Sequence, residues 1–115
     1  MIDEKTAPSI VVDRGQPVIV VVSFCDDDPD LGVYFSFTKP GEERPYTDDG
    51  YGQPRSKITR LGRGIYRYVI QTSGFEGGDG VWHCHGEWSE ARPDGYDAAS
   101  IFGEYHVNHA PAQLL

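Results

Sequence analysis

The sequence predicts an all-β fold in which antiparallel strands form a sandwich, and two observations carry this prediction. First, 14 glycines and 8 prolines are spread along the 115 residues, where they separate short apolar runs, a pattern typical of strands joined by turns. Second, apolar and polar side chains alternate within these runs with the period of a strand, and no stretch has a convincing helical period. A chain of this length forms one domain, so we expect one sandwich with one core.

About seven segments have the length and alternation of strands. In the clearest, Val18, Val20, Val22 and Phe24 share one face, which we assign to the core. Later segments repeat the pattern, with inward sets that include Tyr68, Ile70, Tyr105 and Val107. The expected strands are 9–12, 17–24, 31–38, 56–61, 65–71, 80–87 and 99–107, with a short edge strand near 45–47.

Strands at this spacing favour an immunoglobulin-like antiparallel sandwich with Greek-key connections. We expect the sandwich to span residues 9–109. Residues 1–8 are expected to form an N-terminal arm and residues 110–115 a C-terminal tail, both outside the strands and free to add a strand to a neighbouring molecule.

The charge balance narrows the range of partners. Eighteen acidic and ten basic side chains give a formal net charge of −8, which repels nucleic acid and anionic lipid. The first residues have no signal-peptide pattern, and no apolar run approaches the length of a membrane span. We therefore expect a soluble product of the cytoplasm that binds neither nucleic acid nor membrane, unless a larger particle carries it out.

The segment 80–87 contains two histidines that suggest a metal site. Alternation places Trp82 and Cys84 on one face and His83 and His85 on the other. Because a first shell needs about three or four ligands, we expect the two histidines to face water and to bind no metal or cofactor. A zinc site made by His83, His85 and His106 is the weaker alternative.

A copper site is the other alternative for this segment. The run His83-Cys84-His85 resembles the start of the last copper motif of the multicopper oxidases. The histidine that this family has four residues later is Ser89 here, and the early histidine-rich motif is absent. A cupredoxin-like metal protein is therefore the third of the functions considered.

The two cysteines lie in the strands that a disulfide joins in antibody-type domains. Cys84 shares the inward face with Trp82, whereas Cys25 follows Phe24 and faces outward or enters a turn. Thiols whose side-chain vectors diverge cannot be bridged without moving the backbone, so free thiols are expected.

Calcium binding and catalysis are both disfavoured. The acidic turn has no EF-hand spacing and offers an incomplete ligand set, so a solvated turn is expected. The chain has no Gly-x-Ser-x-Gly, no phosphate-binding glycine loop and no histidine paired with an evident nucleophile and orienting group. We therefore expect a protein that is not an enzyme. The acidic residues considered for calcium are Asp26, Asp27, Asp28 and Asp30, with Asp48 and Asp49 in a second loop.

A series of short signals extends over most of the chain: Asp28-Pro29-Asp30 after an apolar strand, then Gly64-Ile65-Tyr66, Gly80-Val81-Trp82 and Gly103-Glu104-Tyr105-His106-Val107. Their order resembles small immunoglobulin-like sandwich proteins encoded among the virion structural genes of tailed bacteriophages. The resemblance fails at two long insertions, 42–55 and 88–97.

The resemblance implies a structural protein of a virion, made in the host cytoplasm and placed on the capsid surface, which it decorates or reinforces. The implied partners are the major capsid protein or other virion proteins, with self-association in multiple copies. Attachment at the neck or tail is one alternative. A carbohydrate-binding or adhesive module is another, in which Tyr51, Trp88 and Tyr96 form a stacking platform.

Four aromatic residues of the two long loops are candidate anchors for a partner, because no core position requires them. For each residue the alternative is packing against its own sandwich. The candidates are Tyr46, Tyr51, Trp88 and Tyr96.

Overall fold

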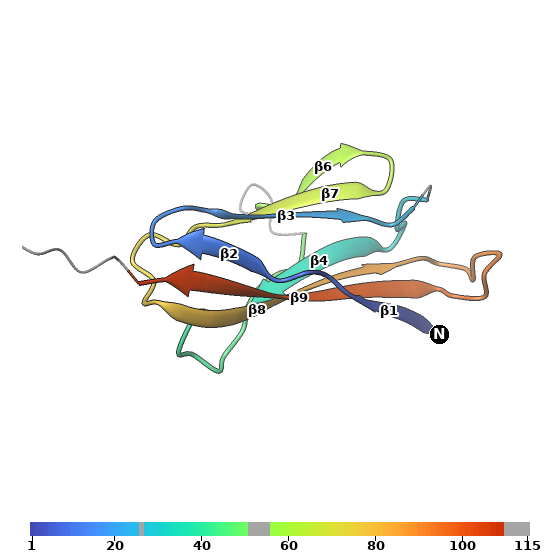
Figure 1. The fold of residues 1–115 in the computed structure, drawn as a ribbon. Helices are drawn as coiled ribbons and strands as arrows, with labels where there is room; N and C mark the ends of the chain where they lie inside the picture. Colours follow the sequence, from blue (N-terminus) through green and yellow to red (C-terminus); the bar gives the residue numbers. More distant parts are fainter. Residues whose placement is uncertain (26, 51–55, 110–115) are drawn as a thin grey trace, which may run out of the picture.

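The computed structural model describes residues 1–25, 27–50 and 56–109 and has nine strands in two sheets (Figure 1), which confirms the predicted all-β sandwich. The large sheet has the order β1-β9-β8-β4-β5, with β2 also paired to β9, and the small sheet has the order β3-β7-β6. The strands are β1 (Ile2–Thr6), β2 (Ile10–Asp13), β3 (Val18–Ser23), β4 (Gly32–Phe37), β5 (Tyr46–Asp48), β6 (Thr59–Gly62), β7 (Ile65–Ile70), β8 (Gly78–Glu87) and β9 (Ala98–Asn108).

The chain crosses between the sheets four times, from β2 to β3, from β3 to β4, from β5 to β6 and from β7 to β8. The hairpins β4–β5, β6–β7 and β8–β9 stay within one sheet. This alternation of hairpins and crossings is the arrangement expected of an immunoglobulin-like sandwich. It brings β8, late in the chain, between β4 and β9 at the centre of the large sheet.

The core lies between the sheets and follows the predicted alternation. Val18, Val20 and Val22 of β3 are buried, as are Tyr105 and Val107 of β9. All are strand residues whose neighbours in sequence are more exposed.

Aromatic rings join the two sheets at the centre of this core. The Phe35 ring stacks on Tyr68 of the small sheet, with centroids 4.1 Å apart, and lies 5.8 Å from the Trp82 ring. Gly103 makes room for this indole, because a Cβ at position 103 would lie 2.3 Å from the Trp82 ring. The inward assignment of Trp82 and Cys84 is therefore confirmed.

The expected N-terminal arm is wrong, because its residues belong to the sandwich. Strand β1 pairs in parallel with the first half of β9, and β2 then pairs with the second half. The Met1 ammonium group also binds the Asp97 carboxylate at 2.7 Å. Pairing with a strand almost a hundred residues away leaves no local pattern in the sequence, and this is why the boundary at residue 9 misses it. The C-terminal tail, 110–115, lies outside the described residues.

The acidic turn between β3 and β4 ties strands together instead of facing only water. Asp28 accepts a hydrogen bond from the backbone N–H of Gly64 and binds Arg60 at 2.5 Å. Asp30 accepts hydrogen bonds from the backbone N–H and the hydroxyl of Ser89, at 2.6 and 2.5 Å. These partners lower the pKa of both carboxyl groups, since they stabilise the ionised form.

The two cysteines are free and lie in different surroundings. Cys25 is exposed in the turn after β3, where its φ is 63°, and Cys84 is buried in β8. Burial raises the pKa of the Cys84 thiol to about 12.

Candidate functional site

The outer face of the large sheet, directed away from the small sheet, holds the polar and aromatic side chains that the core does not use. Strand register places Tyr34 opposite His85 and Ser36 opposite His83 on one side of β8. On the other side, Ser100 lies opposite His85 and Phe102 opposite His83. The prediction that both histidines point away from the core is thus confirmed.

The rings on this face pack against one another, so the expectation that both histidines face water is wrong. His83 stacks on Phe102, with centroids 4.4 Å apart and planes inclined by 3°. Tyr34 stacks on His85 at 4.8 Å and meets His83 edge-on at 5.5 Å. His85 is consequently only 5% exposed. Outward direction from a sheet does not ensure contact with water when neighbouring strands also present rings.

His85 also takes part in a hydrogen-bonded triad with Ser100 and Glu87. Its Nδ1 lies 2.5 Å from the Ser100 Oγ, and its Nε2 lies 3.0 Å from a Glu87 carboxylate oxygen. An ionised Glu87 accepts a hydrogen bond from the His85 Nε2–H, so Nδ1 carries no proton and accepts a hydrogen bond from the Ser100 hydroxyl. The sequence gives no evident sign of this pairing, because the register of β8 and β9 brings His85 and Ser100 together.

The triad fixes the orientation of a ring but has no room for a substrate. Ser100 is 3% exposed and His85 is 5% exposed, so neither the hydroxyl nor the imidazole is open to a substrate molecule. A nucleophile needs a reacting carbon within contact distance and donors aimed at the developing oxyanion. The triad therefore serves to hold His85 in place under Tyr34.

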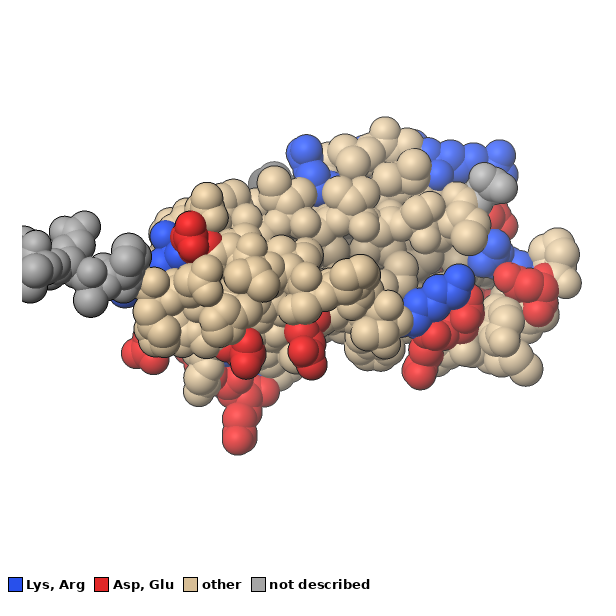
Figure 2. Space-filling model, in the orientation of Figure 1, with Lys and Arg blue, Asp and Glu red and all other residues tan. Residues whose placement is uncertain are grey.

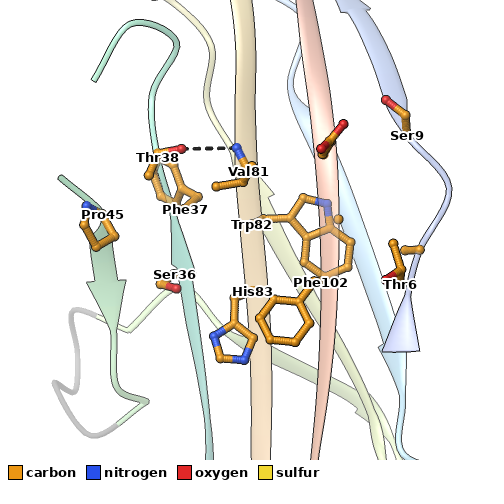
Figure 3. Close-up of a pocket in the computed structure, with 13 residues that line it drawn as sticks. Thr6, Ser9, Ser36, Phe37, Thr38, Pro45, Val81, Trp82, His83 and Phe102 are labelled. Carbon is orange, nitrogen blue, oxygen red and sulfur yellow. Dashed lines mark hydrogen bonds between the residues drawn. The ribbon is translucent and has the colours of Figure 1, made fainter. Parts of the chain in front are cut away.

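Next to the rings, a groove of about 620 Å³ crosses the outer face. Figure 3 shows its floor at Val81, with His83 and Phe102 side by side below it. Pro45, from the β4–β5 hairpin, lies at one side, and Thr6, which ends β1, lies at the other. This volume falls within the range of ligand-binding clefts.

The groove has an apolar floor and a polar, acidic border. Val81 and Phe102 are 49% and 39% exposed, which is unusual for large apolar side chains at the centre of a sheet. Hydroxyl groups of Thr6, Ser9 and Ser36 and the carboxylate of Glu104 complete the lining. The groove can therefore take an apolar group together with hydrogen-bond donors or a positive charge.

His83 contributes a neutral ring to this groove. Burial and the neighbouring His85 lower the pKa of His83, and the carboxylate of Glu4 opposes them more weakly. Its Nε2 is buried and has no hydrogen-bond partner within the described ranges.

Of the four candidate anchors in the loops, Tyr46 and Trp88 differ sharply in exposure. Tyr46 is 57% exposed at β5, where it leans on Phe37. Trp88 is 6% exposed and lies beneath the Arg92 guanidinium at 4.6 Å, so its assignment as a contact residue is wrong and it belongs to the core.

The remaining two candidate anchors are Tyr96 and Tyr51. Tyr96 is half-buried, and Tyr51 lies outside the described residues. Because Trp88 is buried, its ring is not available to the stacking platform expected of Tyr51, Trp88 and Tyr96.

The structure separates the residues of the alternative metal sites. His106 binds Asp79 at 2.7 Å and lies opposite it, four residues along β8 from His83, a distance of about 13 Å along a strand. No group of three or more His, Cys, Asp or Glu with metal-binding geometry occurs in the described part of the chain. Of the acidic turn, Asp26 lies outside that part.

Sequence reasoning missed Tyr34, Ser100 and Phe102 as members of this face. Phe102 had a signal that could have been used, since it lies at an outward position between the inward residues Ile101 and Gly103. No signal in the sequence indicates that Ser100 pairs with His85, because this pairing depends on the register of β8 and β9.

Among the residues that the structure describes, no helix is long and apolar enough to cross a membrane. Compared with known proteins, the sequence matches no family model and no curated protein. The function is therefore argued from the geometry of the outer face and its groove.

Proposed function

We propose that this chain is a non-enzymatic structural protein of a phage virion, which decorates or reinforces the capsid exterior by docking through the outer face of its large sheet. The observation that carries the proposal is the groove of about 620 Å³, with its exposed apolar floor at Val81 and Phe102. A phage virion is proposed as the particle because the order of strand and turn signals resembles that of virion proteins.

The groove has the composition of a protein contact. Stable interfaces combine a few apolar anchors at the centre with a polar rim that stays wet. Here Val81 and Phe102 are the central apolar residues, and Thr6, Ser36 and Glu104 stand around them. The two rings beneath are held in place by stacking, so little side-chain freedom is lost when a partner binds.

The negative charge of the outer face favours a partner segment that carries basic residues. Exposed carboxylates project from three strands of the outer face, at Glu4, Asp79, Glu87 and Glu104. Figure 2 shows acidic side chains along the lower margin of the molecule, beneath the large sheet, and basic side chains at the upper margin, near β6 and β7. An apolar segment with a nearby Lys or Arg on the partner would satisfy both features.

The burial of the triad supports a role without catalysis. Ser100 and His85 are 3% and 5% exposed, and the groove lies beside them without including either. A docking face requires rigid rings, and a satisfied buried network supplies this rigidity.

The proposal is tested on particles of the source phage purified by density gradient. We expect the chain to be present in intact virions at constant stoichiometry, and its absence would overturn the proposal. Cryo-EM of the same particles would then place it on the shell, and a position at the neck or tail would contradict capsid decoration.

Variants test the docking face itself. Phe102→Ser and Val81→Glu remove the apolar floor at exposed positions, and we expect each to lower binding to shells lacking the chain at least tenfold. Leu61→Ser, which changes an equally exposed residue of β6, is the matched control and should bind as the unchanged chain does. Equal binding by all three variants would exclude the groove.

Carbohydrate binding is the second candidate, favoured by the exposed Phe102 ring among the hydroxyls of Thr6, Ser9 and Ser36. A glycan array followed by calorimetry tests it. Saturable binding that Phe102→Ser abolishes, in a chain that does not bind shells, would replace the first proposal.

A further inference from the structure

We propose that two copies of this chain associate through the free edge of β3, so that the small sheets of both copies join into one continuous antiparallel sheet. Strand β3 is an edge strand of the small sheet and, among the residues that the structure describes, pairs with β7 alone. Figure 1 shows β3 at the border of the small sheet, with β7 next to it and β6 beyond β7. An unpaired strand edge is a template for another strand.

The backbone of β3 shows which groups are free. The N–H of Phe24 donates to the carbonyl of Gly64, and the register of β3 with β7 runs without interruption from Val18 to Ser23. Because hydrogen-bonded positions alternate along an antiparallel pair, the groups of Val18, Val20 and Val22 point to β7. Those of Ile19, Val21 and Ser23 point to the free edge.

A second copy of β3 matches this pattern about a two-fold axis through Val20. In that register Ile19 of each copy lies opposite Val21 of the other, and each such pair exchanges both N–H···O=C bonds. The side chains also match, because paired residues of antiparallel strands share a face. Ile19 and Val21, which are 54% and 56% exposed, would then cover one another as β-branched neighbours.

The edge strands β6, β5 and β1 carry features that block strand addition, and β3 does not. The register of β6 shifts between Arg60 and Gly62, β5 has three residues, and β1 has the charged run Asp3-Glu4-Lys5. Charges, bulges and short length are the usual protections of an edge. β3 reads Val-Ile-Val-Val-Val-Ser, with neither a charge nor a proline.

Charge also permits the pairing, although the chain as a whole is acidic. Arg67 lies beside Val21 on the outer face of the small sheet, and Val69 lies beside Ile19. In the two-fold register each cross-sheet row therefore has Arg67 at one end and the partner's Val69 at the other, so no like charges meet. The surface involved is distinct from the groove on the large sheet, and the inference does not depend on the docking proposed above.

Sedimentation velocity across a range of concentrations tests the pairing. We expect the mass to rise from 12.8 kDa toward twice that value. Val21→Pro removes a free N–H while leaving the ladder to β7 intact, since proline is accepted at the outer side of an edge strand, and it should keep the chain monomeric. Leu61→Pro, at the irregular β6 edge, is the matched control and should still dimerise.

Amide hydrogen exchange identifies the interface independently of mutation. In the dimer, exchange at Ile19 and Val21 should slow at least tenfold relative to the dilute monomer, whereas exchange at Val20, already bonded to β7, should change little. A chain that stays monomeric at millimolar concentration would overturn the inference. So would a dimer that survives Val21→Pro or shows protection elsewhere.

Discussion

The outer faces of the two sheets arise from the same alternation of side chains, yet the histidines of the large sheet are covered by neighbouring rings and the apolar side chains of β3 are open to solvent. On the large sheet His85 is 5% exposed, whereas Ile19 and Val21 of the small sheet are more than half exposed. The difference follows from the width of each sheet. The two histidines of β8 have a strand on both sides, from which Tyr34 covers His85 and Phe102 covers His83. An outward side chain on β3 has a neighbouring strand on one side only.

The polarity of an outer face alone therefore does not decide which partner that face can bind. On the large sheet, His85, Ser100 and Glu87 bind one another. The part of this face that a partner can reach is the groove next to them. The small sheet has few polar residues on its outer face and offers backbone groups along β3. We therefore expect the first face to be sensitive to the loss of single side chains and the second to be tolerant.

The largest effect is expected from Trp82→Ala, which removes the ring under the outer face of the large sheet. Trp82 is 3% exposed and packs beside Phe35, so the cavity should lower the free energy of unfolding by about 3–5 kcal/mol. Urea denaturation measures it. His83→Ala, on the opposite side of the same strand, should cost less than about 1.5 kcal/mol, and an equal loss in both variants would mean that the two faces are not distinct.

Two variants, His85→Ala and Ile19→Ala, test whether a covered side chain of the large sheet contributes more to stability than an exposed side chain of the small sheet. Loss of the imidazole leaves the buried Ser100 hydroxyl without its partner, which should cost about 1–3 kcal/mol. Ile19→Ala at an exposed position should stay within about 0.5 kcal/mol. Both are measured by urea denaturation at micromolar concentration, and similar values for the two would remove the basis of the comparison.

The stability of the chain should depend on pH through His83, on the outer face of the large sheet. The pKa of His83 lies below its ordinary value of 6.5 in the folded chain, chiefly because of burial, so the unfolded chain binds more protons just below pH 6.5. Stability should therefore fall as the pH drops from about 7 to 5, following the linkage of protons to unfolding.

His83→Phe, which keeps a stacking ring, should reduce this slope. The carboxyl groups of Asp28 and Asp30, whose pKa is lowered from 3.8, lose their contribution only below about pH 4, so the two ranges are separable. An unchanged slope in His83→Phe would show that another group titrates.

The smallest perturbation is a thiol titration, which compares a cysteine in the turn after β3 with one buried in the large sheet. Cys25 follows β3 and is exposed, whereas burial raises the pKa of Cys84 to about 12. A thiol reagent at pH 8 should label one equivalent in the native chain and a second only in denaturant, counted by mass spectrometry. Rapid labelling of Cys84 in the native chain would indicate that the large sheet opens.

Much of the fold could be predicted because its signals are local. The alternation in Val18 to Phe24 and the turn at Asp28-Pro29-Asp30 gave strands, faces and connections that the structure bears out. The first strand could not be predicted, since its parallel partner is β9. Trp88 could not be assigned to the core either, because the residues that cover it, Phe24 and Arg92, come from separate segments.

The candidate site was predicted only in part. Alternation gave the outward direction of His83 and His85, but the covering rings, the triad and the groove all depend on which residues of β4 and β9 lie opposite β8. A shift of the register by two residues would keep every side chain on its face and still separate His85 from Ser100.

By itself, the sequence determined an all-β sandwich, the inward side of each main strand and an acidic surface, since these follow from the period of a strand and from the count of charges. The tertiary structure alone decided that the histidines are covered, that Ser100 and Glu87 bind one of them, and that β3 keeps a free edge. The physical reason is that strand period acts between neighbours in the chain, whereas register, burial and edge position are set by strands that meet across large distances in sequence.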